Sequence, residues 1–241
     1  MKRKKDLCLV TGGAGFIGSH ITEALLREGH PVRAFDNLAT GRLSNLDSMK
    51  GDLEFFEGDL RQEAQIGKAA RGARYVFHLA AAGAVLRSVA DPFFTHTNNA
   101  TGTLNLLLAA REARVKRVVF SSSSSVYGNS EKFPLSENEV PKPRSPYAVS
   151  KVAGEYYAKI FHRLYGLETV CLRYFNVFGP RQDPNSKYSA VIPLFIDCLI
   201  RGKAPTIFGD GRQSRDFTYV DNVVFGNLLA HEKRQSGRRS F

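Results

Sequence analysis

The stretch DLCLVTGGAGFIGSHITEALLREG, residues 6–29, decides the fold of this chain. The apolar run at 6–10 predicts a β-strand, and the helical periodicity of 16–28 predicts an α-helix. Three glycines permit a tight turn between them: Gly12, Gly15 and Gly18. At such a turn a pyrophosphate can approach bare backbone, and the helix N-terminus presents free N–H groups to it. Strand, glycines and helix in this order predict a dinucleotide-binding unit.

A carboxylate follows the next strand at the distance that such a unit uses. Residues 31–35 predict a second strand, and Asp36 ends it, 18 residues beyond Gly18. A carboxylate there accepts hydrogen bonds from ribose hydroxyls and repels a 2′-phosphate. We therefore expect NAD rather than NADP as the cofactor. The alternative is a surface aspartate in a turn.

Strands and helices alternate along the chain. Helices are expected at 61–70, 91–114, 147–165 and 191–201. Further strands are expected at 53–57, 75–79, 116–120 and 168–173. This alternation predicts an α/β fold, a doubly wound parallel sheet (Rossmann fold) with right-handed crossovers. The sequence pattern changes after Arg173, so we expect an NAD-binding domain at 1–173 and a small, incomplete C-terminal substrate lobe at 174–241.

A polar stretch with a chemical signature follows the strand at 116–120. Five serines lead through a Pro-rich loop to YAVSK at 147–151. Tyr147 and Lys151 are spaced i and i+4, so they share one helical face. An ammonium beside a phenol lowers the pKa of the phenol and prepares it for proton exchange. Taken alone, this stretch could equally be a solvated turn followed by an ordinary helix, because the spacing arises often by chance.

Composition excludes several other classes of function. The net charge of +11 is concentrated at the two ends of the 241 residues, at 2–5 and 233–239, so no nucleic-acid partner is expected. No apolar run approaches the ~18 residues of a membrane span, and no signal peptide opens the chain. Cys8, Cys171 and Cys198 lie in apolar runs without CxxC spacing. They predict buried reduced thiols in a cytoplasmic protein, with no metal site.

Together these segments resemble an extended short-chain dehydrogenase/reductase of the NAD-dependent epimerase/dehydratase family. The resemblance runs in family order from residue 6 to about 225. The matching segments are TGGAGFIGSH, Asp36, GDL at 58–60, HLAA at 78–81, NATGTLNLL at 99–107, SSSSSVYG at 121–128, YAVSK at 147–151, RYFNVFGPRQDP at 173–184 and GDGRQSRDF at 209–217. Within the family the sequence is most similar to UDP-N-acetylglucosamine and UDP-glucose 4-epimerases, enzymes of nucleotide-sugar metabolism and polysaccharide biosynthesis.

The resemblance implies inversion of C4 of a UDP-hexose or UDP-N-acetylhexosamine. Tyr147 would take the proton of the sugar 4-hydroxyl while the C4 hydride moves to NAD. The resulting 4-keto sugar would turn within the site and receive the hydride on its opposite face. Ser123, four residues before Tyr127, would hydrogen-bond the same oxygen, and Lys151 would hold the nicotinamide ribose.

The resemblance also assigns binding residues. Those expected on the cofactor are Gly12, Gly15, Phe16, Ile17, Gly18, Asp36, Asn37, Asp59, Leu60, Leu79, Ala80, Ala81, Asn99, Tyr147, Lys151 and Phe175. Those expected on the substrate are Ser123, Asn176 and Arg215. The guanidinium of Arg215 suits a diphosphate because its fork is planar and bidentate. The alternative for Arg215 is a structural salt bridge to an acidic neighbour.

Several positions depart from the family patterns. Dehydratases carry Asp-Glu directly after the catalytic hydroxyl residue, where this chain has Ser124 and Ser125, so dehydration is not expected. The glutamate of decarboxylating relatives is also absent from that stretch. Gly83, Ala84 and Leu194 replace a lysine, a serine and a basic residue of particular epimerases, which leaves the sugar open.

The family usually continues beyond the length of this chain, and the ending HEKRQSGRRSF does not resemble it. One alternative is therefore a truncated NAD-binding protein with little activity, or a non-catalytic NAD sensor. Another is a different NAD-dependent nucleotide-sugar epimerase or reductase. The intact set of Ser123, Tyr147 and Lys151 favours an enzyme. We also expect a homodimer that pairs through the helices at 92–112 and 147–165.

Overall fold

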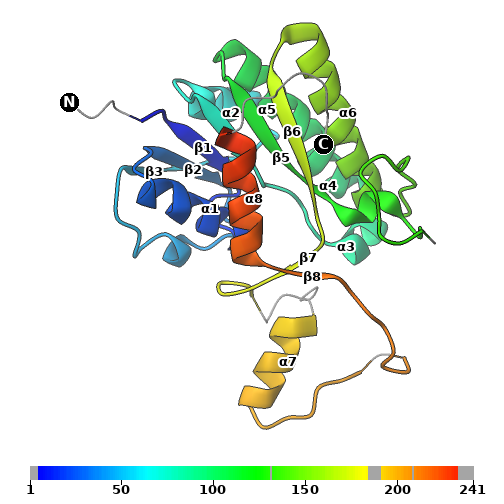
Figure 1. Cartoon of the computed structure of the whole chain (residues 1–241). Coiled ribbons are helices and arrows are strands. Elements are labelled where there is room, and N and C mark those ends of the chain that lie inside the picture. The colour runs from blue at the N-terminus through cyan, green and yellow to red at the C-terminus, as the bar shows by residue number, and fades with distance from the viewer. Residues whose placement is uncertain (1–4, 131, 184–190, 208, 233–241) are drawn as a thin grey trace.

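A parallel sheet forms the centre of the computed structural model, which describes residues 5–130, 132–183, 191–207 and 209–232 (Figure 1). The basic ends at 2–4 and 233–239 lie outside the described residues. The strands are β1 (Cys8–Thr11), β2 (Val32–Asp36), β3 (Leu53–Glu57), β4 (Tyr75–His78), β5 (Arg117–Ser123) and β6 (Glu168–Tyr174). Their order is β3-β2-β1-β4-β5-β6, and each neighbouring pair is parallel. The predicted doubly wound sheet is confirmed, with its topological switch between β1 and β4.

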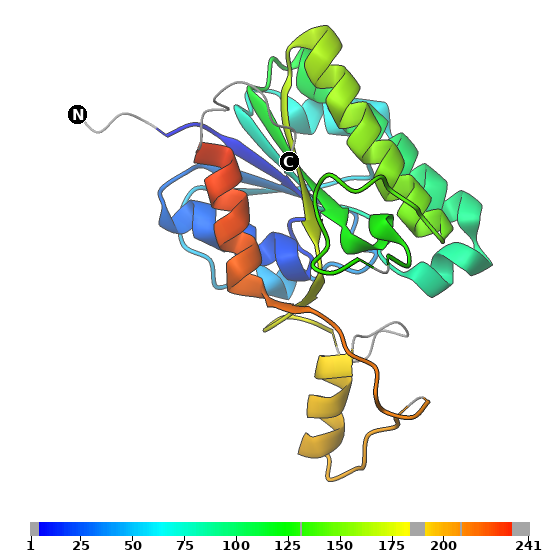
Figure 2. The ribbon, with the colours of Figure 1, turned by 45° about the vertical axis from the view of Figure 1, so that its right-hand side comes forward.

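Helices cover both faces of this sheet, as Figure 2 shows. The helices are α1 (Phe16–Arg27), α2 (Glu63–Ala70), α3 (Val85–Ala90), α4 (Pro92–His96), α5 (Gly102–Glu112), α6 (Pro146–Tyr165), α7 (Val191–Ile200) and α8 (Val220–Glu232). Neighbouring residues of β1 point to opposite faces: Leu9 packs in the core under α2, α5 and α6, and Val10 in the core under α1 and α8. Both residues are fully buried, which explains the continuous apolar strand sequences.

The helical segment expected at 91–114 is divided. Asp91 caps α4, its carboxylate accepting a hydrogen bond from the backbone N–H of Phe94 at 2.9 Å. A π-helical turn at Thr97–Thr101 then separates α4 from α5. Such turns often mark functional sites, and this one carries Asn99. The periodicity of the sequence does not reveal the extra residue, because a π-turn shifts the helix face by only one position.

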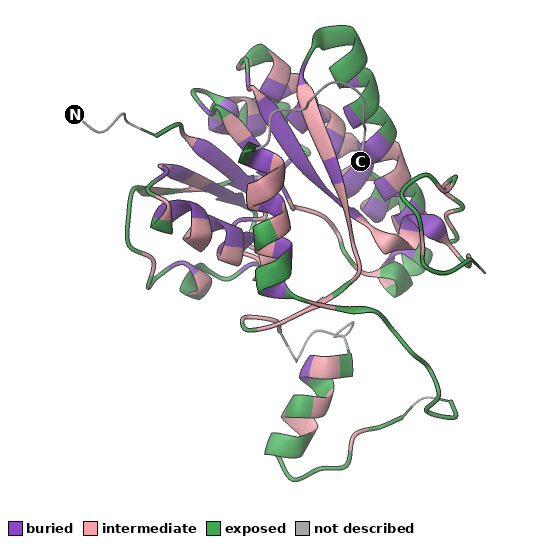
Figure 3. Cartoon of the chain, viewed as in Figure 1, coloured by how far each residue is buried: buried purple, intermediate pink, exposed green. Residues whose placement is uncertain are grey.

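The segment after β6 makes a smaller unit below the sheet. β7 (Asn176–Phe178) pairs in parallel with β8 (Phe217–Tyr219), and α7 stands away from the sheet with largely exposed or half-buried side chains (Figure 3). α8 returns to the sheet, where it packs on α1 and buries Val223 and Asn227. It extends to Glu232, two residues into the ending HEKRQSGRRSF that does not resemble the family. The division of the chain at residue 173 stays a prediction.

The cysteines follow the expectation in part. All three are free, and burial raises the pKa of the Cys8 and Cys171 thiols to about 12. Cys198 differs, because α7 leaves it half-buried. In the part of the chain that the structure describes, no helix combines the length and the apolarity that crossing a membrane requires.

Candidate active site

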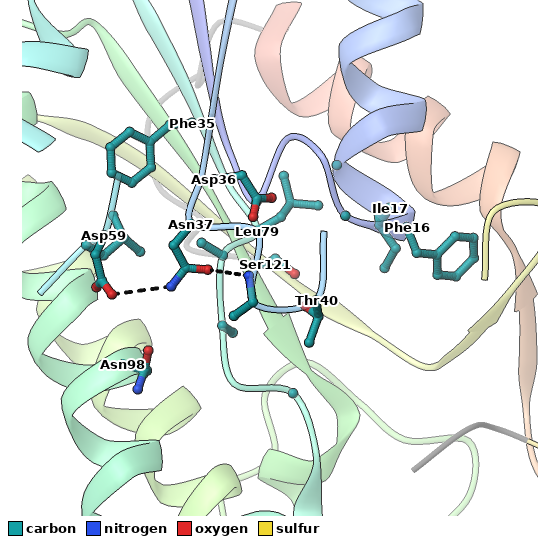
Figure 4. A pocket seen from close by; sticks show the side chains of 18 of the residues that line it. Phe16, Ile17, Phe35, Asp36, Asn37, Thr40, Asp59, Leu79, Asn98 and Ser121 are labelled. Carbon is teal, nitrogen blue, oxygen red and sulfur yellow. Dashed lines mark hydrogen bonds between the residues drawn. The ribbon is translucent and has the colours of Figure 1, made fainter. Parts of the chain in front are cut away.

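A cavity of about 430 Å³ opens at the carboxyl ends of the central strands (Figure 4). It lies at the topological switch point, where open parallel sheets bind their ligands. Eleven of the residues expected on the cofactor line it: Gly12, Gly15, Phe16, Ile17, Gly18, Asp36, Asp59, Leu60, Leu79, Ala80 and Ala81. Asn37 lines it as well. The sequence analysis did not assign the lining residues Thr40, Arg87, Asn98 and Ser121.

The glycine turn is shaped by the absence of side chains. Gly12 has φ 70°, and a Cβ there would lie 2.8 Å from the backbone nitrogen of Ala80 on the neighbouring strand. A Cβ on Gly18 would lie 1.9 Å from the carbonyl oxygen of Gly12. Gly15 is the N-cap of α1 and no side chain caps the helix. The first turn of α1 therefore offers its N–H groups to the cavity, which fits a pyrophosphate.

Asp36 stands at the end of β2 with its carboxylate held by backbone. It accepts hydrogen bonds from the N–H groups of Ala14 at 3.1 Å and Leu38 at 2.9 Å. Burial nevertheless raises the pKa of this carboxyl above its ordinary value, since desolvation outweighs these bonds. Asn37 beside it donates to Asp59 at 3.3 Å, as Figure 4 shows. This row of polar groups fits the two hydroxyls of a ribose.

Asp59 is an anion on the opposite wall of the cavity. Hydrogen bonds from Arg61, the closest at 2.6 Å, lower the pKa of its carboxyl to about 2. Asp36 and Asp59 thus give the cavity two acidic side chains. Arg87 is the one basic side chain among the described residues that line it. The protein thus meets a phosphate mainly with backbone N–H groups rather than with side-chain cations.

Asn99 and His78 hold the strand ends in place. The side chain of Asn99 binds the backbone of Ala82, accepting from its N–H at 2.7 Å, and donates to Ser150 Oγ at 3.0 Å. Asn99 is 3% exposed and braces the cavity wall without lining it. His78 is buried between the hydroxyls of Thr11 at 2.8 Å and Thr103 at 2.9 Å. Burial lowers the pKa of its imidazole to about 3, so His78 is neutral.

Tyr147 and Lys151 come from α6, whose N-terminus is capped by the Ser145 side chain. Lys151 is 4% exposed, and its Nζ donates to the carbonyl oxygen of Ser121 at 2.7 Å. Burial lowers the pKa of its ammonium to about 8. The Lys151 Nζ lies 5.8 Å from the centre of the Tyr147 ring. The i, i+4 spacing thus brings the two groups together as expected.

The phenol of Tyr147 differs from expectation in its protonation. Burial raises the pKa of this phenol above its ordinary value, and a hydrogen bond with the side chain of Ser123 only partly offsets this. The expected lowering by Lys151 is therefore wrong for the protein alone. The reason is the desolvation of the buried phenol, which dominates its pKa while no cofactor is bound. Ser123 itself is the N-cap of a 3₁₀ turn and accepts from the Ser125 N–H at 3.2 Å.

A buried ion pair that was not expected from the sequence fastens these elements. Glu155, one turn beyond Lys151 on α6, accepts hydrogen bonds from Arg173 Nη2 at 2.8 Å and Ser122 Oγ at 2.5 Å. Burial acts to raise the pKa of its carboxyl, but the bonds from Arg173 and Ser122 outweigh that effect and hold it below its usual range. The pair ties α6 to β5 and β6 beside Ser123. The signal was present as a glutamate on the core face of a predicted helix.

Two of the residues expected on the substrate, Asn176 and Arg215, lie below the cavity and do not line it. Asn176 is exposed on β7, and its side chain donates to the carbonyl oxygen of Asp216 at 3.0 Å. Asn176 on β7 pairs with Phe217 on β8, so Arg215, two residues before β8 begins, precedes the strand next to Asn176. The exposed Arg215 guanidinium donates to Ser214 O at 2.7 Å. Phe175 is half-buried, with its ring 6.5 Å from that of Tyr127.

Several known proteins are similar to this chain in sequence and in structure. The chain is 43% identical over 235 residues to a UDP-glucose 4-epimerase of Mycolicibacterium smegmatis, covering 96% of this chain and 75% of that protein. A UDP-N-acetylglucosamine 4-epimerase from Methanobrevibacter ruminantium, solved with UDP-N-acetylmuramic acid, superposes with a TM-score of 0.91 at 47% identity, covering 95% of this chain and 74% of the other. A Thermus thermophilus UDP-glucose 4-epimerase in complex with NAD superposes with a TM-score of 0.87 at 40% identity, covering 95% and 75%.

Residues 8–240, nearly the whole chain, also match the model of a known family. The cavity at the switch point, the glycine turn and the Ser123–Tyr147–Lys151 set agree with that match, and the cofactor that the family description names is the one that the cavity fits. The chain is an enzyme of the NAD dependent epimerase/dehydratase family.

Proposed function

We propose that the chain is a UDP-sugar 4-epimerase, which inverts C4 of a UDP-hexose or UDP-N-acetylhexosamine. One observation carries the proposal: α6 brings Tyr147 and Lys151 together, with the Lys151 Nζ 5.8 Å from the centre of the Tyr147 ring and bonded to the carbonyl oxygen of Ser121 at the wall of the cofactor cavity. A phenol and an ammonium beside the nicotinamide end of an NAD site are suited to proton exchange with a sugar alcohol. The names of the related proteins support the same reaction.

The residues of the glycine turn and Asp36 would hold NAD, which would supply a hydride acceptor and donor for C4 of the sugar. Tyr147 accepts the proton of the 4-hydroxyl and later returns it, so the site must stabilise both the phenol and the phenolate of Tyr147. Lys151 favours the phenolate through its charge, and Ser123 favours it by donating a hydrogen bond. The high pKa that burial gives Tyr147 in the protein alone suits the step in which the proton returns.

Dehydration and decarboxylation are disfavoured by what surrounds Ser123. Ser124 and Ser125 follow it in the 3₁₀ turn, so no carboxylate occupies the positions next to the reacting oxygen. Ser125 Oγ is buried without a hydrogen-bond partner in the structure. An acid and a base for the loss of water are therefore missing from this turn.

We also propose that Asn176 and Arg215 bind the substrate diphosphate. Asn176 lies on β7 and Arg215 lies two residues before β8, the strand paired with β7, and both now use their side-chain donors on nearby backbone carbonyls. Those carbonyls are weaker partners than phosphate oxygens, so exchange toward a diphosphate is favourable.

We propose a homodimer because large apolar side chains are exposed on α3, α4 and α6; α4 and α6 belong to the segments at 92–112 and 147–165 that were expected to pair. Leu86, Phe93 and Leu164 are 71%, 77% and 63% exposed on α3, α4 and α6. Apolar exposure of this extent across adjoining helices marks an association surface. Sedimentation velocity checks the oligomeric state.

A cytoplasmic location is proposed from the buried, unpaired thiols.

The experiment that tests the function uses the NAD-loaded protein with UDP-glucose, UDP-N-acetylglucosamine and UDP-glucuronate in separate reactions. We expect C4 inversion of at least one of them, detected by chromatography of the released sugars. Tyr147→Phe should abolish turnover and retain NAD, because the ring stays and only the proton-exchanging hydroxyl is lost. Protein that holds NAD and inverts none of these sugars would support the sensor alternative instead.

A further inference from the structure

The turn at residues 179–183 lies across the helix that binds the cofactor. It directly follows β7, the strand that carries Asn176 (Figure 1). Arg181 in this turn has φ 65°, a left-handed conformation that a side chain other than glycine rarely adopts. Strained backbone of this kind persists only where the surroundings determine it. The contacts of Arg181 identify those surroundings.

The Arg181 side chain reaches the first turns of α1. Its Nη2 forms an ion pair with Glu23 Oε2 at 2.6 Å, and its Nη1 donates to Ser19 Oγ at 3.4 Å. Both partners of the ion pair are only 23% exposed, so solvent screens it less than a surface pair. His20 on the same helix contacts the carbonyl oxygen of Pro180 at 3.0 Å. The turn is thus held against α1 at two successive residues.

A second contact joins the turn to the other wall of the cavity. Arg42 Nη2 lies 2.7 Å from Asp183 Oδ2, and the Arg42 N–H donates to the carbonyl oxygen of Ala14. Arg42 belongs to the loop whose Ala39 and Thr40 line the cavity. Its side chain is 58% exposed, so this contact contributes less than the one at Arg181.

These contacts connect two binding regions through one short segment. The N-terminus of α1 meets the cofactor pyrophosphate, and β7 carries a residue proposed to bind the substrate diphosphate. A ligand that holds β7 in place also holds the turn against α1. By linkage, the factor by which bound nucleotide sugar strengthens NAD binding equals the factor by which bound NAD strengthens nucleotide-sugar binding.

We propose that Arg181 is a positioning residue that couples retention of NAD to binding of the nucleotide sugar. Its ion pair with Glu23 fastens the turn to α1, so nucleotide bound below the cavity slows the release of NAD. The NAD part of this inference rests on the family assignment. The part that involves UDP rests on the proposed function.

The test measures the rate of NAD release from the loaded protein, with and without UDP, for wild type and for Arg181→Gln. We expect Arg181→Gln to release NAD about tenfold faster, a typical size for coupling between two sites. UDP should slow NAD release from wild type and have little effect on the variant. Arg201→Gln is the matched control, because it removes an ion pair between Asp197 on α7 and the residue that follows this helix, and it should behave as wild type.

A second variant protects the test against misfolding. Glu23→Gln removes the other partner, together with the more exposed pair that Glu23 makes with Arg27, and should give at least the same loss. The double variant should be no worse than Glu23→Gln, since Arg181 acts through Glu23. Release rates within twofold of wild type in both single variants would overturn the role of Arg181. If UDP binds, by calorimetry, and slows NAD release equally in every variant, the coupling alone is wrong. If wild type holds NAD and binds no UDP, the proposed substrate class and the coupling are both wrong.

Discussion

Replacing Glu155 with glutamine tests how the catalytic residues are held. The change keeps the shape of the side chain and removes its charge. Glu155 and Arg173 have side chains only 5% and 14% exposed, so the guanidinium would lose its counter-ion in a place that water barely reaches. Removing one partner of a buried pair typically costs about 3–5 kcal/mol. Arg173 keeps its stacking on the Tyr127 ring, 4.7 Å from the ring centre, so the lower end applies.

We therefore expect Glu155→Gln to lower the free energy of unfolding by about 3 kcal/mol at neutral pH. Turnover should fall as well, because the acceptor of the Ser122 bond next to Ser123 loses its charge and the turn of α6 after Lys151 loses its ion pair with Arg173 on β6. Urea titration of the NAD-loaded protein, followed by circular dichroism, measures the stability. C4 inversion of the active UDP-sugar measures the turnover.

Two further variants separate the ion pair from side-chain size. Asp197→Asn breaks an exposed pair with Arg201 and should cost less than about 0.5 kcal/mol. The double variant Glu155→Leu with Arg173→Met should be more stable than Glu155→Gln, because it leaves no unpaired charge in the core. A loss below about 1 kcal/mol for Glu155→Gln would refute the reasoning that the pair is buried and structural.

Three other predictions follow from the cavity. Gly18→Ala should weaken NAD binding at least about tenfold, because its Cβ would lie 1.9 Å from Gly12 O. In the control Gly67→Ala the new Cβ meets nothing within 4 Å, so NAD binding should stay unchanged. Fluorescence titration measures NAD binding for both variants. Asp36→Ser should raise the affinity for NADP relative to NAD by about tenfold, because the carboxylate that repels a 2′-phosphate is lost; unchanged relative affinities would contradict its role. His78 has a folded pKa near 3, below the unfolded value of 6.5, so its contribution to stability is lost as pH falls through that window. Between pH 7.5 and 5 the wild type should lose about 2 kcal/mol more than His78→Gln, measured by urea titration.

Local patterns in the sequence were enough for the central fold. The apolar strand runs and the glycine turn depend on the backbone conformation of a few neighbouring residues, so their positions in the chain reveal their structure. The cofactor residues of the glycine turn and Asp36 follow for the same reason. Strand ends were less well placed, as β5 shows by continuing to Ser123, three residues beyond the predicted strand.

Other features depend on residues that are distant in the sequence. The bond of Arg173 to Glu155, the seat of His78 between two hydroxyls and the ion pair of Arg181 with Glu23 each join separate elements. No spacing rule relates such partners, because the folded sheet brings them together. The protonation of Tyr147 belongs here too, since burial decided its direction against the expected effect of Lys151.

The sequence by itself therefore determined the parallel sheet and the NAD-dependent family, because strands, helices and the glycine turn are encoded in short-range patterns of backbone and side-chain type. Ser123, Tyr147 and Lys151 stay predictions that come from the resemblance to that family. Only the tertiary structure decided where the Lys151 ammonium points, how the π-turn places Asn99 and which residues hold the turn after β7 against α1. These depend on desolvation and on contacts across the sheet, which exist only once the chain has folded.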